Sequence, residues 1–335
     1  MRYYVVLLSG VIMLISACAT KVRLSDEFNF AGQQINHMLQ EIPKAEAKPD
    51  QVSPRTVENG KLKLVVSRDW TSGFFPGVLW YLYEYTGDSK WLNEAKTYTA
   101  KLEKEQYNKG THDLGFMIYC SFGNGYRLTK DEAYKNVIVQ AAKSLSSRFN
   151  PAAGVIRSWD HHKDVWQYPV IIDNMMNLEL LFEATKFTGD SSFYKIAVTH
   201  ADNTMKNHFR PDYSSYHVVD YNPANGSVNK KMTHQGYADE SAWARGQAWG
   251  LYGYALSYRY TGNKAYLEQA KNIADFILNH PNLPKDGVPY WDFNAPDIPN
   301  TSRDASAAAI TASALYELAD FTQSDFYKEK ADLIL

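Results

Sequence analysis

The chain has 335 residues, a formal net charge of −2 and a hydrophobic content of 45%. This length is enough to bury one large core, and the balanced charge excludes the strongly basic character of nucleic-acid-binding domains. Aromatic residues make up 14% of the chain and include 24 tyrosines and 8 tryptophans. That excess is typical of clefts that stack sugar rings, although a large helical core accounts for it equally well.

The first 17 residues have the pattern of a bacterial targeting segment. Arg2 is followed by an apolar stretch, and the tetrapeptide ISAC that ends at Cys18 resembles a lipobox. We expect cleavage before Cys18, lipidation of its thiol, and a short linker over residues 18–24. This predicts a lipoprotein in the bacterial periplasm or anchored to the outer membrane; the alternative is an ordinary signal peptide with a chance cysteine. Processing leaves Cys120 as a single free thiol in an apolar stretch, which predicts a core residue.

One sequence pattern recurs along the rest of the chain: an apolar helix, a short turn and an amphipathic helix. Glycine at the end of the first helix is a C-cap signal, and the following Asp, Asn or Ser is an N-cap signal. These signals predict five αα-hairpins, which must stack to bury a shared core, and one leading helix over residues 25–40. The five turns fall at residues 85–88, 128–131, 187–190, 260–263 and 321–324.

The two helices of each hairpin differ in character. The first is apolar nearly all round, as in residues 74–85, whereas the second carries a polar face with Lys and Glu. An inner ring of apolar helices wrapped by an outer ring is an (α/α)6 barrel, an all-α fold in which strands are few and short. Long loops on one side, at residues 209–236 and 280–302, would form a cleft.

The predicted helices number eleven, one short of six hairpins. The sequence stops at residues 330–335 inside an amphipathic pattern that has no stop signal. We therefore expect a single catalytic domain over residues 25–335 that is truncated at its C-terminus, with the last helix missing.

Two carboxylates carry the main chemical signal. Asp173 lies in the apolar run VIIDNMMNLELLF, and Asp113 begins the run HDLGFMIYCSF. A buried carboxylate costs several kcal/mol unless it is paired, hydrogen-bonded or protonated. Two such groups in one cavity would share a proton near neutral pH, which suits general acid chemistry on a sugar.

Structural roles for these aspartates remain open. Asp113 follows Thr111 and could simply cap its helix or favour the start of that helix. Asp173 could be a satisfied core residue bonded to a neighbouring Asn or Arg, although Pro169 is expected to mark the first helical turn and to place Asp173 beyond capping reach. Asp304 has the position of a helix-start residue, and we interpret it as structural.

Polar and aromatic residues at the predicted starts of the inner helices, or in the loops near them, are candidates for ligand binding, although each tryptophan could belong to the core. They are Trp70, His112, Trp159, Asn174, Trp243, Arg245 and Trp249. The pair His161-His162 could suggest a metal, but adjacent side chains are expected to point apart, and no helical HxxxH or CxxC spacing occurs. We therefore predict neither a metal nor a cofactor.

The motifs WTSGFFPG, HDLGF, IIDNMMN and WARGQAW, together with Trp159, His217 and Gln235, resemble glycoside hydrolase family 88, the unsaturated glucuronyl hydrolases. The match runs from Asp69 to Asp304 in the family's order. Members act on lyase-generated oligosaccharides, such as those from glycosaminoglycans, whose non-reducing end is a 4,5-unsaturated uronic acid. The resemblance implies hydration of the C4=C5 vinyl ether.

The same resemblance assigns roles to residues. Asp173 matches the general acid/base, which protonates C4 and then deprotonates the water that adds at C5. Asp113 matches a supporting carboxylate that stabilises the cationic transition state. His217 and Gln235 match residues that line the reacting sugar and water, the four tryptophans match the aromatic walls, and Arg245 matches a polar subsite residue.

Three alternatives remain. Family 105, the unsaturated rhamnogalacturonyl hydrolases, has the same barrel and similar chemistry, but HDLGF and WARGQAW with His217 and Gln235 favour family 88. A sugar epimerase on this barrel would need paired histidines in its cavity, where this chain has aspartates. The non-enzyme alternative is a glycan-binding lipoprotein, against which the presence of both aspartates speaks.

Overall fold

The computed structural model describes residues 23–45 and 48–335, so Cys18 and the predicted signal segment lie outside the described residues. The chain divides into two compact units, one ending at Lys44 and the other beginning at Ala45, which are described separately. In the first, α1 (Leu24–Glu41) is followed by the short 3-10 helix η1 (Ile42–Lys44), which confirms the leading helix. None of the helices within the described ranges is both long and apolar enough to cross a membrane.

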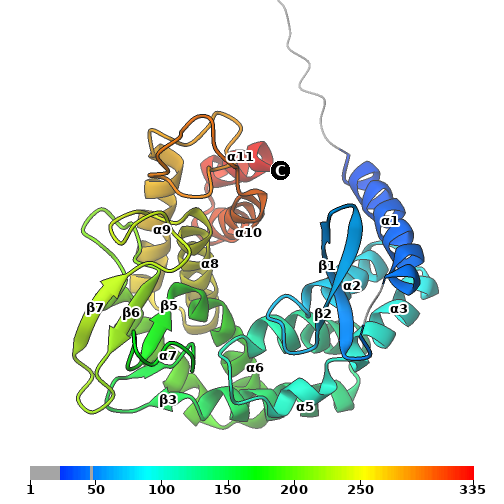
Figure 1. The fold of residues 1–335 in the computed structure, drawn as a ribbon, viewed down its shortest axis with the longest axis horizontal. Coiled ribbons are helices and arrows are strands. Elements are labelled where there is room, and N and C mark those ends of the chain that lie inside the picture. The colour runs from blue at the N-terminus through cyan, green and yellow to red at the C-terminus, as the bar shows by residue number, and fades with distance from the viewer. Residues whose placement is uncertain (1–22, 46–47) are drawn as a thin grey trace, which may run out of the picture. The chain divides into compact units, whose positions relative to one another are not determined.

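The second unit contains the five predicted hairpins (Figure 1). Two of the first helices begin irregularly: the π-helix η3 continues into α4, and the 3-10 helix η4 continues into α6. The hairpin elements are α2 (Phe74–Thr86) with α3 (Ser89–Ala100), η3 (Gly115–Gly123) and α4 (Asn124–Thr129) with α5 (Glu132–Ser146), η4 (Ile172–Asn177) and α6 (Leu178–Thr188) with α7 (Ser191–Asn207), α8 (Ala244–Thr261) with α9 (Lys264–Asn279), and α10 (Ala305–Thr322) with α11 (Asp325–Ile334). A further 3-10 helix, η2 (Glu103–Tyr107), follows α3.

The turn chemistry is what the sequence predicts. Each first helix ends at a residue in the left-handed region, a conformation that glycine adopts without strain. In four of the five turns the next residue caps the second helix by accepting a backbone N–H, as Asp88 does from Lys90 at 2.8 Å; Ser324 makes no such bond. The left-handed residues are Gly87, Lys130, Gly189, Gly262 and Gln323.

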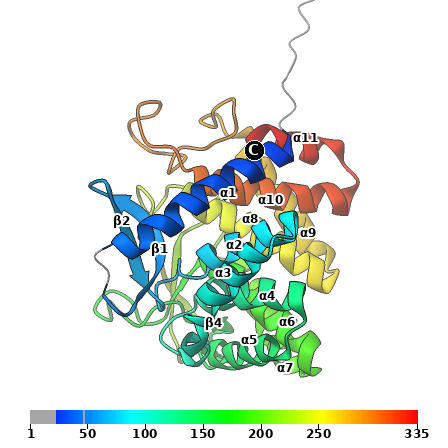
Figure 2. The same ribbon diagram turned by 90° about the vertical axis from the view of Figure 1, so that its right-hand side faces the viewer.

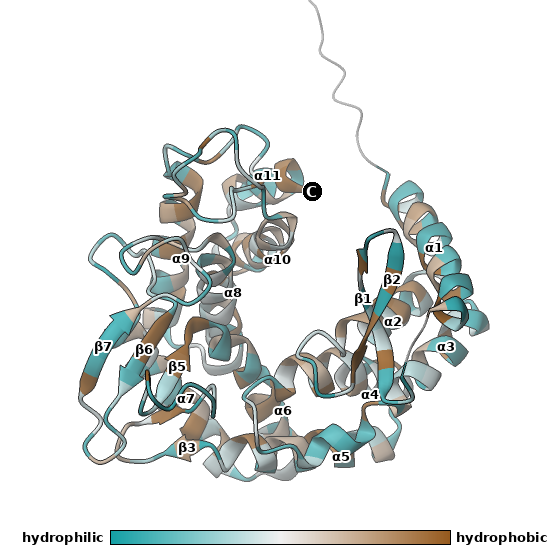
Figure 3. Ribbon diagram, viewed as in Figure 1, coloured by the Kyte–Doolittle hydropathy of each residue, from teal (hydrophilic) through white to brown (hydrophobic). Residues whose placement is uncertain are grey.

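The hairpins form two layers. The first helices pack against one another in chain order, α2 on η3, η3 on η4 and α6, these on α8, and α8 on α10, while each second helix covers its own partner. Both ribbon views show this succession from α2 to α11 (Figures 1 and 2). Apolar residues such as Leu181, Tyr254 and Leu315 are fully buried between the layers, whereas α5 shows hydrophilic residues along its length (Figure 3). This arrangement is the (α/α)6 barrel.

Strands are more extensive than the sequence suggested, and the hairpin of β1 (Gln51–Glu58) and β2 (Lys61–Val66) is a correction. Its turn contains Asn59 and Gly60, both with positive φ, and an Asn-Gly pair of this kind is a strong hairpin signal. A second small sheet pairs β3 (Phe149–Asn150) with β4 (Val155–Ile156), and a third contains β5 (Pro169–Ile171), β6 (Val218–Tyr221) and β7 (Val228–Met232). This third sheet leads directly into the site described next.

Candidate active site

A pocket of about 220 Å³ contains most of the predicted site residues. The pocket is formed by the segments at the starts of η3, η4 and α8, together with the long loops at residues 157–167 and 233–243. Its lining residues are Trp70, His112, Asp113, Trp159, His161, Ile171, Asp173, His234, Gln235, Trp243 and Arg245. The two aspartates, predicted from different apolar runs, therefore meet in one cavity.

Asp173 lies at a strand-to-helix junction, which corrects the expectation for Pro169. Pro169 begins β5 rather than a helix, and Asp173 is the second residue of η4. Because β5 pairs with β6 in the register Ile171 to Val218, the backbone of Ile172 donates to the carbonyl of His217 at 3.1 Å. This pairing brings His217 beside Asp173, although 43 residues separate them in the sequence.

Asp113 is held by a tight turn and not as a helix cap. Its backbone N–H donates to Thr111 Oγ1 at 3.1 Å, and Thr111 Oγ1 donates to Asp113 Oδ2 at 2.6 Å. The helix η3 starts after Leu114 without any side-chain cap, so the capping alternative does not describe Asp113. Its carboxylate is free to face the pocket.

A glycine brings the two aspartates together. A Cβ atom on Gly115 would lie 2.6 Å from the Cα of Asn177, closer than real Cβ contacts. The absence of that atom lets the start of η3 lie against the end of η4, where Asn177 Oδ1 accepts the N–H of Phe116 at 3.1 Å. Any larger residue would force apart the segments that carry Asp113 and Asp173.

The environment of Asp173 favours its protonated form. Asp173 is 7% exposed, and its buried Oδ2 atom accepts no hydrogen bond from any residue in the described ranges. Burial is the main cause that raises the pKa of Asp173 to about 7, and the charge of Asp113 adds to it, while Arg245 acts in the opposite direction. The alternative of a fully satisfied core aspartate is therefore not supported.

His217 is buried and held as one neutral tautomer. Its Nδ1 atom accepts the backbone N–H groups of His234 at 3.0 Å and Gln235 at 3.1 Å, so the proton must reside on Nε2. Burial keeps the pKa of His217 well below its usual value. The Nε2 atom lies 3.8 Å from Asp173 Oδ2 and 3.4 Å from the Gln235 side-chain nitrogen, and Gln235 lines the same pocket as Asp173.

His112 supports the other carboxylate. Its ring is fully buried, its Nε2 atom lies 3.2 Å from Asp113 Oδ1, and burial lowers its pKa. His112 is therefore favoured as a neutral imidazole beside Asp113, and neither of its ring nitrogens makes a hydrogen bond within the described ranges.

Arg245 and the tryptophans form the polar and aromatic walls. The Arg245 guanidinium lies over the ring of Trp243 at 4.6 Å and forms an ion pair with Asp304 at 2.5 Å. Asp304 also caps α10 by accepting the N–H of Ala307 at 2.9 Å, which confirms its predicted place at a helix start. Trp70 meets Phe116 edge-on, and Phe116 in turn contacts Trp249.

Three of the predicted residues do not line this pocket. His217 is buried beside Asp173, with its Nε2 atom 3.8 Å from Asp173 Oδ2. Asn174 is fully buried and donates its side-chain amide to the carbonyl of Ile156 at 2.8 Å, a structural contact. Trp249 lines a different cavity.

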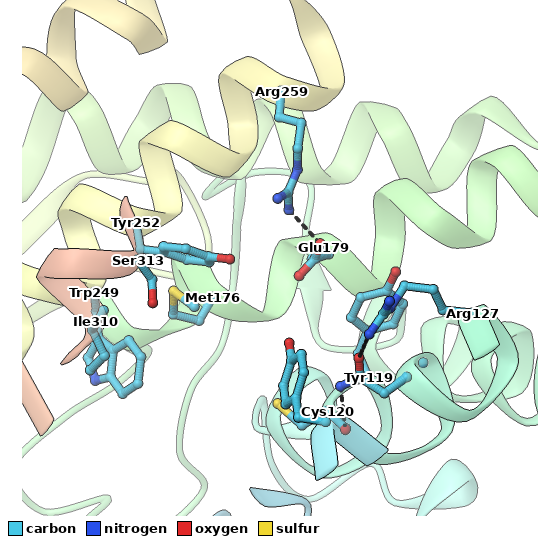
Figure 4. A pocket seen from close by; sticks show the side chains of 13 residues that line it. Tyr119, Cys120, Arg127, Met176, Glu179, Trp249, Tyr252, Arg259, Ile310 and Ser313 are labelled. Carbon is cyan, nitrogen blue, oxygen red and sulfur yellow. Dashed lines mark hydrogen bonds and ion pairs between the residues drawn. The ribbon is translucent and has the colours of Figure 1, made fainter. Parts of the chain in front are cut away.

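That other cavity is larger, about 360 Å³, and lies among the inner helices (Figure 4). The carboxylate that lines this cavity, Glu179, already forms an ion pair with Arg259 at 2.5 Å. Arg259 forms a second ion pair with Glu317 at 2.6 Å. The thiol of Cys120 lines it and is half-buried, with burial raising its pKa to about 12. The ion pairs make this cavity a poor place for proton transfer, and the aspartate pair identifies the smaller pocket as the site.

His161 and His162 were not predicted to belong to the site. The expectation that they point apart is wrong, because their ring centroids lie 4.7 Å apart and His161 lines the pocket. The expectation assumed that successive side chains point in opposite directions, as they do along regular extended backbone. The loop backbone here is irregular, with a positive φ of 51° at His162, so that rule does not hold. No group of three or more His, Cys, Asp or Glu side chains in the described ranges is arranged to hold a metal ion.

A double-layered helical barrel with an aspartate pair in a tryptophan-walled pocket is typical of carbohydrate-processing hydrolases. Residues 44–260 match the profile of Glycosyl Hydrolase Family 88. An unsaturated glucuronyl hydrolase of Formosa agariphila is 49% identical over 99% of this chain and 84% of its own length, and that of Bacillus sp. strain GL1 is 40% identical over 78% and 71%. The chain belongs to glycoside hydrolase family 88, which confirms the resemblance.

Solved structures agree with this assignment. An unsaturated glucuronyl hydrolase specific for heparin superposes with a TM-score of 0.86 at 48% identity, covering 92% of this chain and 82% of its own. An aspartate-to-asparagine variant of the Streptococcus agalactiae enzyme, in complex with dGlcA-GalNAc6S, has a TM-score of 0.72 at 30% identity and covers 92% of this chain and 77% of its own.

Proposed function

We propose that this protein releases 4,5-unsaturated uronic acid from the non-reducing end of oligosaccharides by hydrating the C4=C5 double bond. The observation that carries the proposal is the buried carboxyl of Asp173, which shares one pocket with Asp113, lies 3.8 Å from the imidazole of His217 and has its pKa raised to about 7 by burial. Protonation of an alkene carbon needs an acid whose pKa is raised in a sheltered site, which is what this geometry supplies.

The reaction begins at Asp173. Its proton passes to C4, the electrons of the double bond form the new C–H bond, and positive charge develops on C5 and the ring oxygen. Asp113 stabilises that charge from the same pocket. Water then adds at C5 and gives one proton to the Asp173 carboxylate, which restores the acid.

His217 and Gln235 are suited to hold that water. Their two N–H groups lie 3.4 Å apart and cannot bond to each other, so both can donate to one oxygen beside Asp173. The hemiketal formed at C5 opens by loss of the C5–O5 bond, and the resulting hemiacetal at C1 expels the remaining saccharide. Because the anomeric carbon is never attacked, no set separation of the two carboxylates is required.

The decisive assay uses disaccharides generated by lyases from heparin, chondroitin, hyaluronan and gellan-type polymers. Turnover removes the ultraviolet absorbance of the unsaturated uronate. In deuterium oxide, early product should carry deuterium at C4, since the proton donated there comes from exchangeable Asp173. Binding without loss of absorbance would favour the glycan-binding alternative.

The cellular location is part of the proposal. The lipobox ending at Cys18 supports cleavage and lipidation, and therefore an enzyme in the periplasm or attached to the outer membrane. Mass spectrometry of the mature N-terminus distinguishes a lipidated cysteine from the product of an ordinary signal peptidase.

A further inference from the structure

Three imidazoles lie side by side near the catalytic pocket, and two of them, His161 and His234, line it. The rings of His161 and His162 are 4.7 Å apart, and those of His162 and His234 are 6.3 Å apart. All three residues are exposed, and their side chains make no hydrogen bond to another residue in the ranges that the structure describes. We call His161, His162 and His234 the imidazole wall. Its ring nitrogens are available to a ligand.

The wall is rigidly supported. Asp160, which precedes it, is held by Arg148 at 2.8 and 3.2 Å, and Arg148 is only 7% exposed. His161 stacks on Trp159 with centroids 5.2 Å apart and an interplanar angle of 24°. Trp166 donates to the sulfur of Met232 at 3.0 Å, which ties this loop to the end of β7 just before His234.

The wall is also connected to the catalytic centre. The backbone N–H of His234 donates to His217, whose other nitrogen faces Asp173. His162 holds a positive φ of 51°, a conformation that costs energy in a residue with a side chain and that persists only where surrounding contacts fix it. Strained residues of this kind concentrate at binding sites.

On this basis we propose that the imidazole wall binds an oxyanion of the substrate. The oxyanion is either the carboxylate of the unsaturated uronate or a negatively charged substituent, such as sulfate, on the sugar that follows it. The inference depends on the proposed function. Ring N–H groups bind oxyanions strongly when they are charged, and carboxylate and sulfate present the same kind of acceptor oxygen.

The charges around the wall make this binding depend on pH. His161 faces His162, His234 and Asp160, and His234 faces His162 and the neutral His217. Asp160 is engaged by Arg148 and Arg157, while Lys163 and Asp164 follow in the same loop. Partial desolvation and the charges of the neighbouring imidazoles lower the pKa values of His161 and His234, which disfavours their charged forms while no anion is bound. An arriving anion reverses that repulsion and favours proton uptake.

The test compares His161→Asn/His162→Asn with wild type, and uses His37→Asn, an exposed histidine on α1, as the matched control. Sulfated and unsulfated forms of one unsaturated disaccharide, and the methyl ester of its uronate, are assayed at about pH 5.5 and about pH 8. Binding is measured separately by calorimetry in an Asp173→Asn background. We expect KM and Kd to rise about tenfold at the lower pH with little change in kcat, corresponding to the loss of a charge-assisted hydrogen bond.

The comparison of the three substrates distinguishes the two possible anions. Loss confined to the sulfated substrate assigns the wall to the following sugar, whereas equal loss on both acids, absent for the ester, assigns it to the uronate carboxylate. Lysine in place of asparagine at position 162 (His162→Lys) should restore anion binding and should make that binding independent of pH. A loop with only a structural role would not give this result. Unchanged KM and Kd for all substrates overturn the inference, and absence of turnover in wild type would instead reject the proposed function.

Discussion

The Nε2 atom of His217 lies 3.8 Å from Asp173 Oδ2, while its Nδ1 atom is fixed by two backbone N–H groups. The imidazole is therefore a neutral donor whose direction cannot reverse. We predict that His217→Asn lowers kcat about 10- to 100-fold, because the water and the carboxyl lose a preorganised N–H group. Steady-state kinetics measure this, and a change in KM alone would show that His217 only binds substrate.

The pH profile of the enzyme should report Asp173. Since the acid must be protonated and its pKa is raised to about 7, kcat/KM should fall as the pH rises through that value. Removal of the neighbouring negative charge in Asp113→Asn lowers the pKa of Asp173, so the falling limb should move to lower pH in the residual activity. A limb that stays in place, or moves to higher pH, contradicts the coupling of the two carboxylates.

Gly115→Ala should separate the two aspartates. Its Cβ would collide with the backbone of Asn177 at 2.6 Å, so either η3 or η4 must shift. A displacement of about 1 Å in a catalytic group can cost about a hundredfold in rate, and we expect a loss of that size in kcat. Gly110→Ala is the control, because its Cβ meets only a side-chain oxygen at 3.4 Å. Equal activity in the two variants would show that this close approach is unimportant.

Two substitutions at Asp304 separate its two roles. Asn retains the ability to cap α10 but loses the ion pair with Arg245, whereas Ala loses both. Asp304→Asn should therefore raise KM with little change in the free energy of unfolding, and Asp304→Ala should in addition lose about 1 kcal/mol. Thermal unfolding and kinetics on both variants test this. Identical KM values in Asp304→Asn and wild type would show that the ion pair with Asp304 does not position Arg245 for substrate binding.

The sequence was most informative where structure is determined locally. Turn residues such as Gly87 and Asp88 act within a few positions, so all five hairpins could be predicted. Asp173 was conspicuous because a carboxylate in an apolar run is costly wherever the chain goes.

Contacts set by pairing between distant segments were not predictable in the same way. The position of His217 depends on the β5–β6 register, and its role came only from the family resemblance. His161 and His162 were misjudged because the expectation assumed regular backbone, which their loop does not have. The close approach at Gly115 depends on Asn177, 62 residues away, and carries no local signal.

Turnover by Asp173→Asn is the most direct test of the proposed chemistry. The substitution preserves the size of the side chain and replaces the titratable carboxyl group with an amide, which has no acidic proton to donate. With an unsaturated disaccharide that wild type consumes, we predict a loss of about a thousandfold or more in kcat, with unfolding temperature and ligand binding retained. Activity within about tenfold of wild type in a folded, binding-competent variant would show that another group protonates the double bond.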